Sequence, residues 1–524
     1  MERNKNDIDV ILIYPRTGFD LGSTVAPPFS SLTIAAPLKR NGIKVRIIDQ
    51  RVDRNWMKNL EESLKSNPIC CGISAMTGTQ ISFGIDVARI IRNHDDGGIP
   101  IVWGGPHPSI LPEQTLRSEY VDIACVGEGE ETFLDLVDAL SKKRALSEVK
   151  GIGFLDGGRY VYTGDRLFLS VEDFLETPWD LVDVESYIHQ DLYLREAKRV
   201  LDVGQTSRGC PYRCTFCSSA SIRRHKWRGM SVEKALNMIT ENVNRFKLDG
   251  IWLRDDEFYL DIERATNICQ GMIDNKLNLD WYTSGTRVND VLRATDEQIK
   301  LLKRSGCYVL KIGAESGSDR ILKFIRKNQT VEQILEVNQK CKKYGIKPAY
   351  SLMCGFPTET IEEINKTIDL FFRIQDENPD ASCETIAQYT ALPGTEMFKV
   401  AVEMGLKPPE TFEAWADWLF HEADSKGDRI PWFTRKERKW IANLNYMSIL
   451  SKTAANVMTT FADSYIIKIL YYIAKPVSKY FGWRLRNKYY NFVPEIKPIK
   501  AFQQYMFSST NLFNTKNKDP VPDA

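Results

Sequence analysis

"RGCPYRCTFCSS", residues 208–219, places three cysteines on one short stretch, at spacings of four and three residues. They are Cys210, Cys214 and Cys217. Three thiolates on one loop can bind three irons of a cubane cluster and leave the fourth iron open to another ligand. Structural zinc needs four protein ligands, and no second cysteine pair follows at zinc spacing. Two alternatives stay open: a mononuclear site completed by His225, and three inert buried cysteines.

The segments around the cysteines predict a barrel that does not close. Between residues 196 and 400, apolar stretches alternate with helix-length stretches such as "SVEKALNMITENVNRF". The predicted strands are "VGQTSRG", "GIWLRDDEF", "LDWYTSGTRV", "CYVLKIGAES", "KPAYSLMCGF" and "CETIAQYTALPGT". Six strand and helix units are too few for a closed eight-stranded barrel. We therefore expect an open (β/α)6 barrel with its site at the carboxyl ends of the strands.

Residues 1–145 show a second alternation, with apolar runs such as "VILIYP", "KVRIID", "ICCGIS" and "IPIVWGG". Continuous apolar runs separated by helix-length segments are typical of a parallel sheet covered on both faces. The sequence predicts a doubly wound α/β domain, which binds ligands at the carboxyl ends of its strands. Residues 146–195 are expected to form a connector with a hairpin at Gly157 and Gly158.

Length and composition exclude several classes of protein. A chain of 524 residues is too long for one core, so several domains are expected. Its net charge of +1 gives no general attraction to nucleic acid. Eleven cysteines in a chain whose first residues lack an apolar signal core predict a reducing, cytoplasmic location. No run of 18 uncharged apolar residues occurs, so a membrane-spanning helix is not expected.

The cysteine motif, with the aromatic Phe216 before its last cysteine, resembles that of the radical S-adenosylmethionine (SAM) superfamily. The resemblance implies a [4Fe-4S] cluster on the three cysteines, with SAM chelated to the open iron. It also implies an external one-electron reductant and cleavage of SAM to a 5′-deoxyadenosyl radical. The cofactors would supply the radical, and the protein would supply orientation and exclusion of water.

The same resemblance implies which side chains contact SAM. The stretch "LRDDEF" stands where the superfamily places its contact with the methionine amine, and two later strand ends match positions that meet the carboxylate or ribose. The candidates are Asp255, Asp256 and Glu257 for the amine, and Arg287, Glu315 and Ser316 for the carboxylate or ribose. The stretches "CGFPTET" and "ALPGTEMF" resemble the strands that surround adenine.

An α/β domain before such a barrel resembles the cobalamin-binding members of the superfamily, which include the anaerobic magnesium-protoporphyrin monomethyl ester cyclase and the cobalamin-dependent methylases. The matching stretches are "ISAMTGTQ", "WGGPHPSILPE" and "VDIACVGEGEETF". The implied cobalamin contacts are Ser74, Met76, Thr77, Gly104, Gly105, His107, Gly127 and Glu128. The loop "YPRTGFDLG" lacks the histidine of the DxHxxG motif, so cobalt would have no protein histidine below it. A domain that kept the fold without the cofactor is the alternative.

Three functions follow as hypotheses. The first is methylation of an unactivated carbon of a large or hydrophobic substrate, with the methyl group coming from methylcobalamin. The second is radical rearrangement or oxidative ring closure, as in the cyclase. The third is a non-enzymatic iron-sulfur or corrin carrier, against which the polar strand ends argue.

Residues 401–524 are expected to be mostly helical and aromatic-rich. The segment 465–500 mixes aromatic, aliphatic and basic residues as interfacial helices do. One interpretation is a packed helical cap. The other is a substrate lid that contacts a membrane surface and admits a small-molecule or lipid-like substrate.

Overall fold

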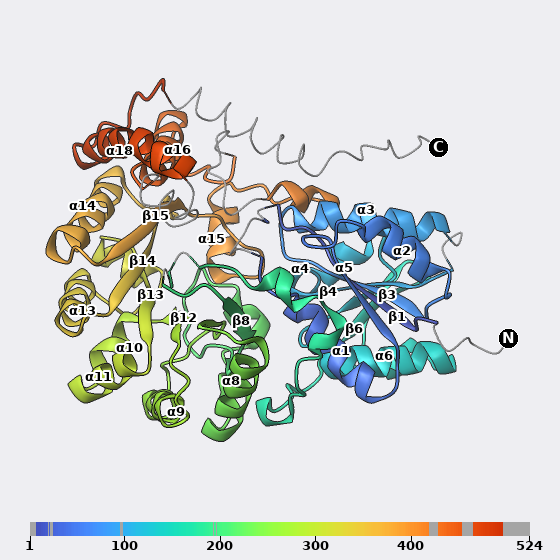
Figure 1. The fold of residues 1–524 in the computed structure, drawn as a ribbon. Helices are drawn as coiled ribbons and strands as arrows, with labels where there is room; N and C mark the ends of the chain where they lie inside the picture. The colour runs from blue at the N-terminus through green and yellow to red at the C-terminus, as the bar shows by residue number, and fades with distance from the viewer. Residues whose placement is uncertain are drawn as a thin grey trace.

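The computed structural model describes residues 7–18, 20, 25–94, 98–191, 193–194, 196–418, 428–452 and 465–495, without the side chains of 465–471 and 473. Two sheets lie side by side, and C-terminal helices cover the far end of the second (Figure 1). The fold class expected from the sequence is confirmed: a doubly wound α/β sheet, an open parallel barrel and a helical C-terminal region.

The first sheet has seven strands in the order β2-β1-β3-β4-β5-β6-β7. The first five run parallel, and the last two add to the β5 edge as an antiparallel hairpin. The strands are β1 Val10–Tyr14, β2 Val45–Asp49, β3 Cys70–Ser74, β4 Ile101–Gly104, β5 Ile123–Cys125, β6 Ile152–Asp156 and β7 Arg159–Tyr162. The sheet therefore continues past residue 145, because the hairpin of the predicted connector pairs with it.

Helices cover both faces of this sheet. Two of them contact each other on one face and two others contact each other on the opposite face (Figure 1). They are α1 Phe29–Arg40 with α6 Glu130–Lys142, and α2 Trp56–Leu64 with α3 Gln80–His94. Short helices α4 Pro106–Ile110 and α5 Pro112–Leu116 follow β4. Because both faces are covered, β1 is apolar and buried along nearly its whole length.

The connector ties the two halves together. It contains the 3₁₀ helices η2 Leu146–Glu148, η3 Val171–Asp173, η4 Trp179–Leu181 and η5 Val184–Tyr187. The ring of Trp179 packs edge-on against Phe29 of the first domain and Phe246 of the second, at 5.8 and 5.6 Å between centroids. The hydroxyl of Tyr187 donates a hydrogen bond to Asp49, at 2.9 Å.

The second sheet has six parallel strands in the order β15-β14-β13-β12-β11-β8, so β15 and β8 are its open edges. The strands are β8 Val200–Gly204, β11 Gly250–Leu253, β12 Asp280–Thr286, β13 Cys307–Glu315, β14 Lys347–Cys354 and β15 Ser382–Gln388. The helices between them are α8 Val232–Phe246, α9 Ile262–Asp274, α10 Val288–Arg293, α11 Asp296–Arg304, α12 Asp319–Phe324, α13 Val331–Tyr344 and α14 Ile361–Glu377.

Local signals explain where these helices start and stop. Thr330 caps α13 and forms a capping box with Gln333, which satisfies two backbone donors of the first turn. The helix ends at Gly345, whose φ of +66° suits a residue without a side chain. Thr360 caps α14 through the same kind of box with Glu363.

The C-terminal region covers one open edge of the barrel. It contains α15 Glu396–Glu403, η6 Glu413–Asp417, α16 Arg435–Leu450 and α18 Tyr465–Arg486. In α16, Asn445 donates to the Ile386 carbonyl at 2.9 Å, and the hydroxyl of Ser448 accepts from the Ile386 N–H at 3.0 Å. The helix thus satisfies backbone groups of β15 that no strand pairs. Within the described ranges, no helix is both long enough and apolar enough to cross a membrane.

Candidate active site

The three cysteines lie on a loop between the two-residue strand β9 (Ser207–Arg208) and the short helix α7 (Ser219–Arg223). β9 pairs with β10 (Arg228–Gly229), which closes the base of the loop. Gly209 precedes the first cysteine with a φ of +85°, and a Cβ there would lie 2.0 Å from the Lys226 carbonyl oxygen. Only glycine therefore fits where the loop begins.

Backbone hydrogen bonds hold the middle of the loop from both sides. The Thr215 N–H donates to the Ile325 carbonyl at 3.1 Å, and the Met397 N–H donates to the Thr215 carbonyl at 2.9 Å. The side chain of Cys214 is buried, and Cys210 and Cys217 are half-buried. The loop brings all three predicted cluster ligands to the carboxyl end of the barrel.

Burial opposes ionisation of two of the three thiols. Burial raises the pKa of Cys210 to about 12 and raises the pKa of Cys217 as well. Thiols must lose their protons to bind iron, so metal and proton compete here. Within the described residues, no three histidine, cysteine or carboxylate side chains converge on a single ion, including around His225. The imidazole of His225 instead lies 3.2 Å from the Tyr212 carbonyl.

Two of the three acids after β11 are held by the protein itself. Asp255 is buried and accepts hydrogen bonds from the Thr206 N–H and hydroxyl, at 3.1 and 2.9 Å. Asp256 accepts from the Gly209 N–H at 2.9 Å. These two carboxylates fix the turn that leads into the cysteine loop.

Glu257 is different, because its buried Oε1 has no hydrogen-bond partner among the described residues. Burial raises the pKa of Glu257 well above its ordinary value, and the neighbouring Asp290 adds to this shift. The Arg287 guanidinium opposes it. A cationic ligand beside Glu257 would lower this pKa and favour the ionised carboxylate.

Arg287 connects the cysteine loop to the barrel. Its Nη1 lies 3.3 Å from the Cys214 sulfur, and its Nη2 donates to the Lys327 carbonyl. Its guanidinium carbon lies 3.8 Å from the centre of the Tyr212 ring. The Nε of Arg287 has no partner among the described residues.

Glu315 forms a buried ion pair with Lys327, at 2.7 Å between the charged atoms. Ser316 accepts from the Ser318 N–H at 3.1 Å and lies 3.3 Å from the Thr367 hydroxyl. Sequence reasoning missed Lys327, since no motif marks it and only the turn after α12 brings it to Glu315. Both predicted residues thus have protein partners in the structure.

The buried atoms without partners test whether SAM fits this end of the barrel. Besides Glu257 and Arg287, the described residues leave the hydroxyl of Thr286 and the amide oxygen of Gln329 without hydrogen bonds. Buried polar groups are normally paired, so such a group of orphans indicates a polar ligand. Carboxylate, guanidinium, hydroxyl and amide groups complement the ammonium, carboxylate and ribose hydroxyls of SAM.

Aromatic side chains form an apolar wall next to the loop. Phe216 packs edge-on against Phe356 at 6.1 Å, and Phe356 stacks on Tyr389 at 4.9 Å between centroids. Trp432 of the C-terminal region reaches the same group, 6.5 Å from Tyr389. Such a wall suits a flat apolar ring.

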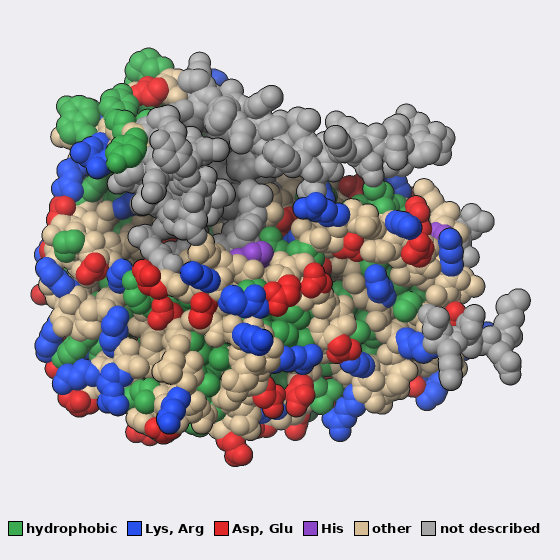
Figure 2. All heavy atoms as spheres, in the orientation of Figure 1, with side chains coloured by type: hydrophobic (Ala, Val, Ile, Leu, Met, Phe, Trp, Pro, Cys, Tyr) green, Lys and Arg blue, Asp and Glu red, His purple; other side chains and the backbone are tan. Residues whose placement is uncertain are grey.

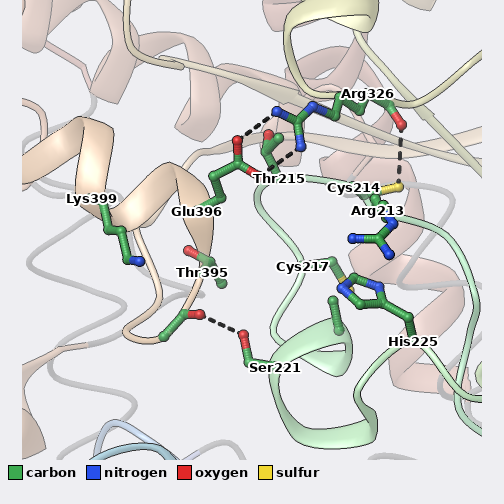
Figure 3. Close-up of a pocket in the computed structure, with 12 residues that line it drawn as sticks. Arg213, Cys214, Thr215, Cys217, Ser221, His225, Arg326, Thr395, Glu396 and Lys399 are labelled. Atoms are coloured by element: carbon green, nitrogen blue, oxygen red, sulfur yellow. Dashed lines mark hydrogen bonds and ion pairs between the residues drawn. The ribbon is translucent and has the colours of Figure 1, made fainter.

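A pocket of about 380 Å³ opens on the other side of the cysteine loop (Figure 3). Its walls include Cys214, Cys217 and His225, with Arg326 and Glu396 paired at its rim. Two of the three cysteines therefore form part of the wall of an open pocket.

The strand ends of the first sheet leave room for a ligand at two glycines. A Cβ on Gly104 would meet only the Cys125 Cβ at 3.6 Å, and one on Gly127 would meet nothing within 4 Å. Gly105 differs, because its φ is +96° and a Cβ there would lie 2.9 Å from the Ala75 carbonyl. The open space at Gly104 and Gly127 is a cradle that suits cobalamin, although the φ of Gly127, +88°, also favours glycine there. Gly105 has no room for a side chain and is required by the fold itself.

The other predicted cobalamin contacts have mixed surroundings. His107 is fully buried, its Nδ1 lies 2.9 Å from the Thr77 hydroxyl, and burial lowers its pKa to about 4. Its ring lies 5.5 Å from both Phe412 and Trp415, so the C-terminal region encloses it. The Met76 N–H donates to a glutamine side chain on α3. Ser74 ends β3 and stays partly accessible.

Glu128 points into a group of arginines rather than into open space. Its side chain is 6% exposed and pairs with Arg223 at 2.7 Å and with Arg228. Arg208 lies 3.7 Å from it and pairs with Glu130 at 2.7 Å. All three arginines flank the cysteine motif, so this carboxylate joins the first domain to the cysteine loop.

Three loop thiols on an open barrel, beside a doubly wound sheet with a ligand cradle, define a radical enzyme that uses SAM together with cobalamin. Residues 205–371 match the Radical SAM superfamily, and residues 23–137 match the B12 binding domain. An uncharacterized methyltransferase of Pyrococcus horikoshii is 32% identical over 404 residues, which cover 76% of this chain and 84% of the relative. The chain belongs to the cobalamin-binding radical SAM enzymes.

Two further comparisons agree. The anaerobic magnesium-protoporphyrin IX monomethyl ester cyclase of Rubrivivax gelatinosus is 28% identical over 306 residues, 57% of this chain and 53% of the cyclase. The solved structure of OxsB, a cobalamin-dependent SAM radical enzyme with aqua-cobalamin and SAM bound, matches with a TM-score of 0.71 at 21% identity. The match covers 96% of this chain and 76% of that chain, and it supports the fold.

Proposed function

We propose that this enzyme methylates an unactivated carbon of a large or hydrophobic substrate. When bound, the cluster, SAM and cobalamin supply a carbon radical and a methyl group. The proposal rests on one observation: the structure has both buried polar atoms without hydrogen-bond partners around Glu257 and a glycine cradle at Gly104. The name of the Pyrococcus horikoshii relative supports methyl transfer as the reaction.

Each part of the site has a proposed task. Cys210, Cys214 and Cys217 hold the cluster. Glu257 accepts hydrogen bonds from the SAM amine, and Arg287 neutralises negative charge beside the cluster. Asp255, Asp256, Glu315 and Ser316 support these side chains, and the aromatic wall at Phe216 excludes water from the adenine side.

The strand ends of the first sheet hold cobalamin in this proposal. Gly104 and Gly127 let it approach the backbone, with Ser74, Met76 and Thr77 beside them. Gly105, His107 and Glu128 maintain the shape of this face. No described histidine is proposed below cobalt, because His107 is neutral, enclosed by aromatic rings and hydrogen-bonded to Thr77.

A labelled methyl group tests the proposed reaction. Reconstituted wild-type protein, given a chemical reductant, cobalamin, methyl-labelled SAM and a metabolite extract of its source organism, should transfer the label to carbon in one product. Gly104→Phe should fill the cradle, lower cobalamin binding by at least about tenfold and stop methyl transfer. Because Gly104 belongs to the first sheet and is not part of the cysteine loop, this variant should keep its iron content and 5′-deoxyadenosine formation.

The matched control is Gly42→Asn, at a surface position where a Cβ meets nothing within 4 Å and where the φ of +77° is one that asparagine tolerates. It should bind cobalamin like wild type. Omitting the reductant should stop formation of both 5′-deoxyadenosine and the methyl-labelled product. If a substrate is consumed and its product carries no label, the reaction is rearrangement or ring closure rather than methylation. Unchanged methyl transfer in Gly104→Phe would contradict the assigned cradle.

We also propose that the C-terminal region contacts a membrane surface. Large aromatic side chains are exposed within residues 472–492 and gather over α18 at the upper left of Figure 2. They are Tyr472, Tyr480, Trp483, Tyr489 and Phe492. The helix carries Lys475, Lys479 and other bases but no acid. Tyrosine, tryptophan and lysine together suit the boundary between anionic headgroups and acyl chains.

Sedimentation with vesicles tests this surface. The full chain should co-sediment with anionic vesicles at low salt, and Trp483→Ser should weaken binding. Lys475 and Lys479 contribute about 1 kcal/mol each, so replacing both with glutamine should weaken binding roughly thirtyfold. Leu167→Ser, which removes an exposed apolar side chain elsewhere, should have no effect. Absence of wild-type binding would leave a packed helical cap as the interpretation.

A further inference from the structure

Arg254 places a positive charge at the mouth of the barrel, one residue after β11 and directly before Asp255. Its backbone is fixed, because its N–H donates to the Gly204 carbonyl at 2.8 Å and its carbonyl accepts from the Gln205 amide at 3.0 Å. The side chain leaves from the carboxyl end of a central strand, where the site of a parallel barrel lies.

The guanidinium plane of Arg254 is held from two sides. Its Nε donates to the carboxylate of Asp202, whose side chain is only 1% exposed. Its central carbon lies 4.3 Å from the centre of the Trp252 ring. A buried carboxylate and an aromatic face therefore set the orientation of this arginine before any ligand binds.

Trp252 is itself held in place. Its indole N–H donates to the Ser284 hydroxyl at 2.7 Å, and its ring stacks on Tyr282 at 5.7 Å with an angle of 11°. The hydroxyl of Tyr282 donates to the buried Asp191 at 2.9 Å. This series of contacts crosses the inner face of β11 and β12. It leaves Arg254 little freedom to move.

The two outer nitrogens of Arg254 remain available. No described residue accepts a hydrogen bond from either Nη atom, and 40% of the side chain is exposed. Ser284, which accepts the hydrogen bond from Trp252, is also exposed, on the neighbouring strand β12. A fixed guanidinium with a free fork is the geometry that binds carboxylate or phosphate through two parallel hydrogen bonds.

We infer that Arg254 is the anion-recognition residue of the substrate site, so that the molecule entering the barrel carries a carboxylate or a phosphate group. The inference rests on the proposed function and adds a charged end to its substrate. The hydrophobic part would lie toward the aromatic wall, and the anionic end would lie on the fork of Arg254.

Calorimetric titration with small anions tests the inference without turnover. The full-length protein, with its cluster reconstituted and saturated with SAM and cobalamin, is titrated with inorganic phosphate, with benzoate and with neutral benzamide. Wild type should bind one of the two anions and not benzamide, and the preferred anion distinguishes carboxylate from phosphate. Arg254→Gln should weaken that binding at least about tenfold.

Two further variants keep the test decisive. Arg254→Lys retains a cation beside Asp202, so the protein should fold, but it loses the fork and should also weaken anion binding. Arg199→Gln removes an arginine that is 39% exposed and already paired with Glu185, and anion binding should not change. Equal affinities in wild type and Arg254→Lys would overturn the inference.

One more comparison shows whether Arg254 serves a cofactor or the substrate. If wild type binds the anions without cobalamin but loses them when cobalamin is added, the fork serves the cofactor and the inference fails. Because the readout is binding, a protein that transfers no methyl group can still pass this test. Failure of methyl transfer and failure of the inference are therefore distinguishable.

Discussion

Replacing Cys214 with alanine should reduce SAM cleavage to background, a loss on the order of 10⁴-fold or more, as expected when one member of a catalytic unit is removed. Cys214 is the buried member of the three cysteines and lies 3.3 Å from Arg287. Removing it takes away one of three proposed iron ligands and the group that Arg287 faces. Iron and sulfide content, the electron paramagnetic resonance spectrum of the reduced protein and 5′-deoxyadenosine formation measure the effect.

The matched control for this prediction is Cys341→Ala. Cys341 is also buried but lies on α13, outside the cysteine loop, where it packs as a small apolar residue. It should keep full iron content and SAM cleavage. Near-normal 5′-deoxyadenosine formation in Cys214→Ala would show that the cysteine loop is not the cluster site.

Replacing Glu128 with alanine should destabilise the protein by about 3–5 kcal/mol, because it leaves buried arginine charge uncompensated. Arg223 would lose its carboxylate partner, and burial already lowers the pKa of Arg223. The lost pairs join the first domain to both flanks of the cysteine loop. The unfolding temperature should fall by several degrees, and limited proteolysis should cleave more readily between the domains.

Two variants separate charge from side-chain packing. Glu128→Gln keeps the shape and hydrogen-bonding capacity of the side chain, so a comparable loss would assign the effect to charge. Glu131→Ala, three residues along at a 56% exposed position, should change stability by less than about 0.5 kcal/mol. If Glu128→Ala unfolds at the same temperature as wild type, these ion pairs do not stabilise the contact between the first domain and the cysteine loop.

The sequence predicts those features that depend on residues close together in the chain. The three cysteines are fixed by their own spacing, and the apolar run of β1 specifies a buried strand without reference to any partner. The sequence could not identify Lys327 or Arg254, because each acquires its role from a carboxylate on a barrel strand, 12 and 52 residues away, to which no motif connects it. Glu128 shows the same difficulty: its three arginines lie 80 to 100 residues away, so a cofactor contact and an interdomain ion pair look alike in the sequence.

The structural roles of neighbouring glycines also cannot be distinguished from the sequence. Gly104 and Gly105 are identical neighbours in the sequence, yet only Gly105 has a positive φ and a backbone carbonyl in the path of a side chain. Such a difference depends on the parallel pairing of β3 with β4, which no local pattern encodes. The hairpin β6 and β7 was predicted from its turn, whereas its pairing with β5 depends on the tertiary fold.

The hydrogen bonds from α16 to β15 also bear on how the chain behaves during synthesis. Until Asn445 and Ser448 have emerged, the Ile386 backbone groups at the edge of the barrel lack their partners. An uncovered edge strand is a template for pairing with other chains. The barrel edge is therefore open to pairing with other chains until α16 has been synthesised, whatever substrate the finished enzyme binds.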